Sequence, residues 1–231
     1  NTHIPRARAH THTHNTCVYI YIHGSKDDPT KYRCLALLNH AYKIMSVVLL
    51  KRLVAECKSF FSEWQAGFRA KRGCRDNVLL LRVLYDQIIN NNRKCVVTSV
   101  DYSEAFDSIS HKFMDTTLAK AGASRKSRAM LRAIYVVAQG RARVRGINGT
   151  YILSDPFDVN RGVIQGDIIS PVLFILTLDQ IMQRYDTKIR GLRCGRILRI
   201  KTLGYADDIA LISETVEEQT DRFSRIADAS L

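Results

Sequence analysis

Two short apolar runs in this chain are each directly adjacent to aspartate in the sequence, and this pattern limits the folds that the chain can adopt. The first run, "KCVVTSV", is rich in β-branched residues, which favour strands, and it ends at Asp101. The second, "GYADDIALI", places Asp207 and Asp208 directly before an aliphatic stretch. A charged carboxylate beside buried apolar surface is costly unless it is neutralised. We therefore expect these acids to share a role at the ends of two strands.

If the two strands are neighbours in one sheet, three carboxylates converge and repel one another unless cations bind them. Oxygen ligands suit Mg²⁺, which typically uses carboxylates together with substrate phosphates. Two such ions form the clamp that is used in nucleotidyl transfer. The alternative is a hairpin turn that holds Asp-Asp for conformational reasons, since aspartate tolerates turns. That alternative is weaker, because hairpin turns usually favour Asn-Gly or Asp-Gly.

The rest of the chain alternates helical and strand-like patterns. Helices are expected over 38–58, from a cap at Asp76 or Asn77 to Asn90, and after the strand that ends at Asp101, up to Ala121–Gly122. Three further helices are expected from a cap at Ser124 to near Gly140, from Ser170 to Tyr185, and after a Thr215–Glu218 capping box. Hairpins are expected over 141–154, with Asn148-Gly149 as a two-residue turn, and over 196–213, with the acids at the turn. The mixture predicts an α+β fold, with an antiparallel sheet that carries helices on one side.

Composition and charge narrow the class of protein. Hydrophobic residues make up 46% of the 231 residues, enough for a core and too many for wholesale disorder. No apolar run approaches the roughly 20 residues of a membrane helix, so no membrane partner is expected. Lys and Arg outnumber Asp and Glu by 35 to 22 and cluster at 68–75, 140–146 and 188–201. This excess favours a nucleic-acid partner over ordinary basic solubility.

The N-terminal part has an unusual composition. Residues 11–14 and 19–22 each alternate two residue types, as a translated dinucleotide repeat would, so residues 1–27 are expected to be low-complexity and poorly structured. The less favoured alternative is metal binding by alternate histidines on one face of a strand, at His10, His12 and His14. The six cysteines lack a C-x-x-C pair, which predicts reduced thiols in an intracellular protein, with nucleus or cytoplasm left open.

Five segments in order carry a resemblance to a known family. The segments "TSVDYSEAFDSI", "RGVIQGDIISPVLFIL" and "LGYADDIALI" resemble motifs A, B and C of reverse transcriptases. The run "QAGFR" resembles the fingers motif Q-x-G-F-R, and "YRCLALLNHAYKI" resembles an earlier fingers segment. The forms of motifs A and B are most similar to those of non-LTR (LINE-type) retrotransposon enzymes. The resemblance covers about Asp28 to Leu231.

The resemblance implies a right-hand polymerase palm, with an antiparallel sheet packed on helices, plus partial fingers. Residues 28–98 would form the partial fingers, and residues 99–231 would form the palm with motifs A, B and C. Cys34 replaces the proline that is usual in the early fingers segment. The chain, which starts with Asn1, is expected to be a fragment that stops before the primer grip and thumb. The thumb, and an endonuclease as a further candidate, are expected elsewhere in the full-length retroelement protein.

The resemblance also assigns roles to individual residues. The acids expected in catalysis and metal binding are Asp101, Asp207 and Asp208, with two Mg²⁺ ions, or Mn²⁺ in their place. The residues expected to bind the incoming nucleotide are Phe106, Gln165, Gly166, Arg33 and Lys43. The residues expected near template or primer are Gln65, Gly67, Phe68, Arg69 and Tyr205. From the residues alone, Phe106 could instead be core, and the Gln165–Gly166 pair a plain loop.

The function implied by the resemblance is RNA-directed DNA polymerisation. An RNA template pairs with a DNA primer, and two-metal nucleotidyl transfer adds deoxynucleoside triphosphates to that primer. The alternative hypothesis is an inactive or domesticated reverse-transcriptase remnant that binds nucleic acid without polymerising. The intact acids favour the first hypothesis, whereas the expected truncation favours the second for the isolated chain.

Overall fold

The computed structural model of the chain describes residues 15–21, 32–102, 105–145, 148–185, 191–195 and 198–229. Its elements are, in chain order, β1 (Asn15–Tyr21), β2 (Tyr32–Leu37), α1 (His40–Glu56), α2 (Cys74–Asn90), β3 (Val96–Val100), α3 (His111–Lys120), α4 (Arg125–Val136), β4 (Gln139–Arg145), β5 (Tyr151–Leu153), β6 (Phe157–Asp158), α5 (Ser170–Tyr185), β7 (Leu192–Cys194), β8 (Leu198–Ile200), β9 (Thr202–Tyr205), β10 (Asp208–Ser213) and α6 (Val216–Ala229). Within these described ranges, no helix is long and apolar enough to cross a membrane.

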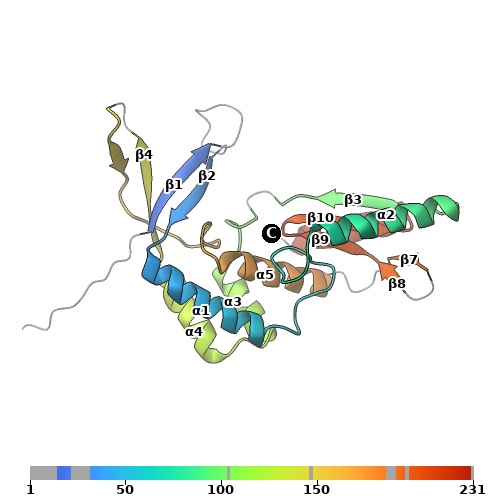
Figure 1. Ribbon diagram of the computed structural model, residues 1–231, viewed down its shortest axis with the longest axis horizontal. Coiled ribbons are helices and arrows are strands. Elements are labelled where there is room, and N and C mark those ends of the chain that lie inside the picture. Colours follow the sequence, from blue (N-terminus) through green and yellow to red (C-terminus); the bar gives the residue numbers. More distant parts are fainter. Residues whose placement is uncertain are drawn as a thin grey trace, which may run out of the picture.

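The sheet that carries the acids has three antiparallel strands in the order β3-β10-β9. Because side chains alternate along a strand, β10 buries apolar groups on both of its faces. Ile209 and Leu211 join the core cluster that contains Leu173 of α5, whereas Ile212 packs with Leu84 of α2. Helices therefore cover both faces of this sheet, and the expectation of helices on one side alone is wrong. Figure 1 shows α2 in front of the β9–β10 hairpin and α5 below it.

A second sheet stands at the opposite end of the molecule, above α1 and α4 in Figure 1. Its strand order is β2-β1-β4-β5, and β6 also pairs with β4. β1 pairs with β2 antiparallel and with β4 parallel, with Asn15 opposite Gly140. Residues 15–21 belong to the segment that was expected to be poorly structured, and in the structure they form strand β1. The segment "NTCVYIY" is rich in β-branched and aromatic residues, which favour strands whatever the origin of the repeat. The three histidines of the proposed metal site lie outside the described residues.

Several predicted boundaries are confirmed. The hydroxyl of Ser124 accepts a hydrogen bond from the Ser127 amide at 3.2 Å, which caps α4. The Thr215 hydroxyl accepts one from the Glu218 amide at 3.2 Å, at the start of α6. α3 ends at Lys120, just before Gly122, whose φ of 92° is accessible to glycine without strain.

Other boundaries differ from the prediction for local reasons. α2 begins at Cys74 rather than after Asp76, because the Asp76 carboxylate accepts the Gly73 amide at 2.9 Å from inside the first turn. α4 ends at Val136, short of Gly140, because β4 already begins at Gln139. The β4–β5 register pairs Arg145 with Tyr151, so five residues rather than two form the connection.

Candidate active site

The strand ends bring the predicted acids to one edge of the central sheet. Asp101 directly follows β3, and β3 pairs with β10 so that Val100 lies opposite Ile209. Continuing this register by one residue places Asp101 opposite Asp208. Asp207 immediately precedes β10, and Asp208 is its first residue. Motifs A and C therefore meet at the same end of the sheet, as the two strand patterns predicted.

The turn that carries Asp207 has an uncommon backbone conformation. Tyr205 of β9 pairs with Asp208 of β10, so the hairpin loop has two residues, Ala206 and Asp207. Ala206 has a φ of 57°, which alanine rarely adopts, whereas Asp207 has an ordinary negative φ. A positive φ at the first loop residue alone is the pattern of a type II′ hairpin turn, which normally takes glycine there. The conformation leaves Asp207 half-buried and Asp208 exposed.

A cavity of about 350 Å³ joins the three motifs. Its lining includes Tyr102, Ala105 and Phe106 of motif A, the motif B residues Gln165 to Asp167, Ser170 and Pro171, and Asp207 of motif C, with Leu35 from β2. The nucleotide-binding residues predicted from motifs A and B thus lie around one space with a predicted catalytic acid. Arg33 lies on β2, two residues before Leu35. Lys43 is exposed on α1 and does not belong to the described lining.

The motif B loop is held tightly against β2 and motif A. The Gln165 carbonyl accepts the Ala36 amide at 2.8 Å, and its side-chain amide donates to the Asp107 carboxylate at 2.8 Å. Gly166 has a φ of 103°, and a Cβ there would lie 2.8 Å from the Ala36 carbonyl oxygen. Only glycine fits at this position, so the loop can pass close to β2 beside the cavity.

A buried carboxylate that sequence reasoning missed links this loop to helix α1. Asp167 accepts hydrogen bonds from the Tyr42 hydroxyl at 2.6 Å and from the Ser46 hydroxyl at 2.5 Å, both on α1. Burial, followed by the hydrogen bond to Asp167, raises the pKa of Tyr42, so its hydroxyl remains a donor. The only sequence signal for this contact was Asp167 itself, an acid in an otherwise apolar segment of motif B. The sequence did not indicate which residues would be its partners.

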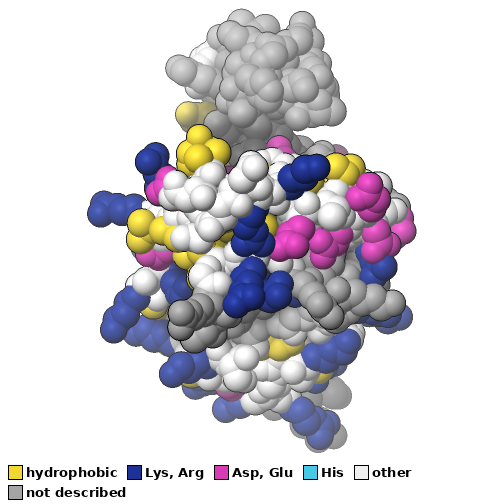
Figure 2. Space-filling view, turned by 90° about the vertical axis from the view of Figure 1, so that its right-hand side faces the viewer, with side chains coloured by type: hydrophobic (Ala, Val, Ile, Leu, Met, Phe, Trp, Pro, Cys, Tyr) yellow, Lys and Arg dark blue, Asp and Glu magenta, His cyan; other side chains and the backbone are white. Residues whose placement is uncertain are grey.

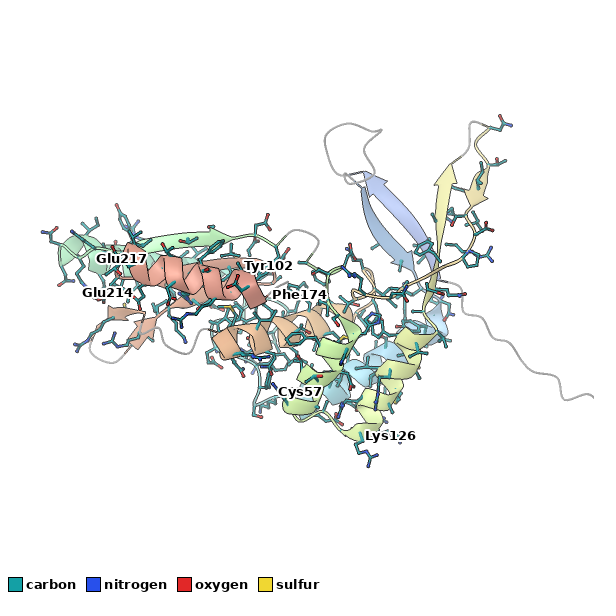
Figure 3. All side chains as sticks on the ribbon, turned by 180° about the vertical axis from the view of Figure 1, so that it is seen from behind. Cys57, Tyr102, Lys126, Phe174, Glu214 and Glu217 are labelled. Atoms are coloured by element: carbon teal, nitrogen blue, oxygen red, sulfur yellow. The ribbon has the colours of Figure 1, made fainter. Side chains whose placement is uncertain are left out.

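Phe106 faces two environments. Its ring stacks on Phe174 of α5, with centroids 4.7 Å apart and planes 16° apart, and it also lines the cavity of about 350 Å³. Phe174 in turn lines a neighbouring cavity of about 280 Å³ together with Tyr102. Figure 3 shows Tyr102 and Phe174 near each other. The predicted sugar contact and the core reading therefore both have a structural basis at this residue.

The predicted template and primer residues divide into buried and exposed ones. Gln65 and Gly67 are buried, and the Gln65 side chain contacts the Ala206–Asp207 turn. Arg69 is bound to its own loop, where its guanidinium donates to the Ser62 carbonyl at 2.5 Å and lies over the Phe61 ring. Phe68 is 51% exposed and Tyr205 is 41% exposed, so these two aromatic side chains remain open to a ligand.

The acids do not form a ready-made metal cage. Among the described residues, no three acidic, histidine or cysteine side chains gather closely enough to hold an ion. The three carboxylates expected to converge therefore lie at neighbouring strand ends, without forming such a cluster. This arrangement still fits Mg²⁺, which usually binds one or two carboxylates and completes its shell with water and substrate phosphates. Asp101 and Asp207 offer carboxylates of this kind at the edge of the sheet.

Comparison with known proteins identifies the family. The family model described as "Reverse transcriptase (RNA-dependent DNA polymerase)" matches residues 24–230. The Pol polyprotein of the type-2 retrotransposable element R2DM of Drosophila melanogaster is 28% identical over 187 residues, which cover 81% of this chain and 17% of the relative. The Pol polyprotein of a type-1 retrotransposable element R2 of Nasonia vitripennis is 26% identical over 199 residues, which cover 86% of this chain and 18% of the relative. The chain thus spans less than a fifth of the length of these relatives.

Solved structures share the fold at low sequence identity. The telomerase of Candida tropicalis in complex with a TWJ fragment of telomeric RNA matches with a TM-score of 0.63 and 12% identity, over 94% of this chain and 39% of that one. An apo form of that telomerase, truncated from its C-terminal domain, matches with a TM-score of 0.58 and 14% identity, over 94% and 46%. These likenesses confirm the α+β polymerase fold. The family match covers nearly all of the chain, which therefore belongs to the reverse transcriptase family as a domain of the non-LTR retrotransposon type.

Proposed function

We propose that this domain extends a DNA primer on an RNA template, with deoxynucleoside triphosphates as substrates. The observation that carries the proposal is the shared cavity, where Asp207 of motif C faces the same space as Phe106 and the Gln165–Gly166 pair. Asp101 lies at the adjacent strand end. Family membership supports the same reaction. The template, the primer and the remainder of a retroelement protein, including a thumb, are the partners that the proposal requires.

Asp101 and Asp207 would hold the divalent ions, with Asp208 beside them. Bound Mg²⁺, or Mn²⁺ in its place, would neutralise the triphosphate and lower the pKa of the primer 3′-hydroxyl. The protein residues mainly position the reactants and supply a fixed electrostatic environment. The stacked ring of Phe106 would lie beside the sugar, and the motif B loop would support the nascent base pair. Exposed Phe68 and Tyr205 would contact template and primer.

Primer extension by the longest natural product that contains this chain tests the proposal. Asp101→Ala and Asp207→Ala should each abolish Mg²⁺-dependent incorporation on an RNA template, because each removes a proposed metal ligand. RNA binding should stay close to wild type, because nucleic-acid contacts do not need these acids. Asp208→Ala should also reduce incorporation strongly. The matched control is Asp228→Ala, which removes an exposed carboxylate on α6 and should leave incorporation unchanged.

The outcomes separate the two hypotheses. If either Asp101→Ala or Asp207→Ala extended primers at near wild-type rate, the assignment of the catalytic acids would be wrong. If the wild-type protein bound RNA but incorporated no nucleotide, the domain would instead be an inactive remnant that retains nucleic-acid binding.

A further inference from the structure

The side chain of Gln65 makes its hydrogen bonds to the turn that carries Asp207 and to its own loop. Its oxygen accepts hydrogen bonds from the Ala206 amide at 2.9 Å and from the Gly67 amide at 2.8 Å. Its nitrogen donates to the Ala206 carbonyl at 3.0 Å. Gln65 is fully buried, with 0% of its surface exposed. One side-chain amide therefore satisfies both backbone polar groups of Ala206, which would otherwise be buried without partners.

Ala206 is the residue of the turn that needs such support. Its φ of 57° lies in the left-handed region, where an L side chain crowds the following carbonyl. A residue in a sparsely populated conformation persists only when the surrounding structure holds it there. The bidentate contact from Gln65 is directed at this residue, one position before Asp207.

The backbone around Gln65 is docked onto β9, which keeps the amide in place. The Gly204 amide donates to the Trp64 carbonyl at 2.9 Å, and the Ala66 amide donates to the Gly204 carbonyl at 2.9 Å. The approach is so close that a Cβ on Gly67 would lie 2.3 Å from the Ala206 nitrogen. A Cβ on Gly204 would lie 2.3 Å from the Trp64 ring. Two glycines thus permit the Q-x-G-F-R loop to seat against motif C.

We propose that Gln65 is a positioning residue that holds the Ala206–Asp207 turn in its strained conformation and thereby sets where the Asp207 carboxylate stands relative to Asp101. This inference rests on the proposed polymerase function. It gives the glutamine of the Q-x-G-F-R motif a role that needs no contact with template or nucleotide. The loop that contains Gln65 then stabilises the turn through a contact between residues 141 positions apart in the sequence.

The first test compares Gln65→Met with Asn77→Leu in the longest natural product that contains this chain. Methionine keeps the shape of glutamine and removes its hydrogen bonds. Because a displacement of about 1 Å at a reacting group can cost about 10²-fold, we expect kcat for primer extension to fall about 10- to 100-fold, with little change in the KM for deoxynucleotide. The control Asn77→Leu removes a side-chain hydrogen bond to the Gly204 carbonyl, of 2.9 Å, at the same junction but away from the turn. It should lower stability and leave kcat near wild type.

The second test is rescue by Ala206→Gly in the Gln65→Met background. Glycine adopts a positive φ without strain, so the turn should depend less on the clamp, and the double variant should be more active than Gln65→Met alone. Hydrogen exchange of the Ala206 amide, measured on the same proteins, should be faster in Gln65→Met and unchanged in Asn77→Leu. If Gln65→Met does not fold, Gln65→Glu replaces it, because glutamate keeps the acceptor oxygen and loses the amide donor.

The readouts distinguish the possible failures. Equal losses of kcat in Gln65→Met and Asn77→Leu, or no rescue by glycine, would reduce Gln65 to a purely structural role and overturn the proposal. Unchanged exchange at Ala206 in Gln65→Met would overturn it as well. A wild-type protein that extends no primer would refute the polymerase function, while the exchange experiment would still report whether Gln65 holds the turn.

Discussion

Phe106 lies between a stacked aromatic partner and an open cavity, so one substitution separates its two roles. A ring beside the sugar would leave no room for a 2′-hydroxyl, which excludes ribonucleotides by steric clash. We expect Phe106→Val to admit ribonucleotides and retain deoxynucleotide incorporation, and each tenfold loss of selectivity would correspond to about 1.4 kcal/mol. Incorporation of both nucleotide types and the melting temperature should be measured together.

The control for this experiment is Phe174→Val. Phe174 supplies the other half of the stack and does not belong to the described lining of the cavity beside Asp207. Truncating a buried aromatic side chain costs about 3–5 kcal/mol when the product is alanine, so this variant should melt at a lower temperature with sugar selectivity intact. The same result for Phe106→Val would leave Phe106 as packing alone.

Asp179 makes stability depend on pH. It is fully buried on α5, where its carboxylate accepts the Ser62 amide at 3.1 Å, and burial raises its pKa to about 6. A carboxyl whose pKa is raised by folding favours the folded state in its neutral form, so this contribution is complete below about pH 4 and is lost as the pH rises through about 6. Asp179→Asn should therefore raise the free energy of unfolding at pH 8, by at most about 3 kcal/mol.

Denaturant titrations of wild type and Asp179→Asn at pH 5 and pH 8 check this expectation. The hydrogen bonds from Ser62 and the Arg69 guanidinium partly offset the effect of burial, and the pKa of about 6 for Asp179 already includes this offset. Asp86→Asn, at a partly exposed position on α2, is the matched control and should show no comparable pH dependence. A gain for Asp179→Asn that is equal at both pH values would argue against a raised pKa.

At the scale of elements, helix α1 is joined to the motif B loop by the Asp167 hydrogen bonds. Tyr42→Phe removes one donor and leaves a buried carboxylate oxygen without that partner, which should cost about 1–3 kcal/mol of unfolding free energy. Urea unfolding measures the cost, and Tyr85→Phe, at an exposed position on α2, is the control that should change stability little. If the two variants were equally stable, the link between α1 and motif B would contribute nothing measurable.

The whole molecule carries an excess of positive charge, with a formal net charge of +13. On the face seen in Figure 2, Lys and Arg side chains are spread widely, and acidic side chains gather on one side. Such a distribution predicts binding to nucleic acid that is steep in salt and largely independent of sequence. Each neutralised phosphate contributes about −0.9 to the slope of log K against log salt for duplex DNA and about −0.7 for single strands. A flat salt titration of RNA binding would contradict the prediction.

Local sequence patterns were sufficient for the strands that carry the acids. The β-branched run before Asp101 and the aliphatic run after Asp208 form strands β3 and β10, since strand propensity and side-chain alternation act over a few residues. The caps at Ser124 and Thr215 were predictable for the same reason. The order of the motifs carried the family resemblance, which the family match confirms.

Only the tertiary structure decided how these parts meet. Gln65 reaches Ala206 across 141 positions, and Tyr42 reaches Asp167 across 125 positions. Neither pair has a local pattern, because each contact depends on how whole elements pack and on glycines that permit a close approach. The parallel pairing of β1 with β4 was likewise not predictable from local sequence, since strand propensity does not specify which strand is the partner. The sequence by itself thus determined which residues form the strands that carry Asp101 and Asp208, whereas long-range packing determined which side chains support the turn before β10.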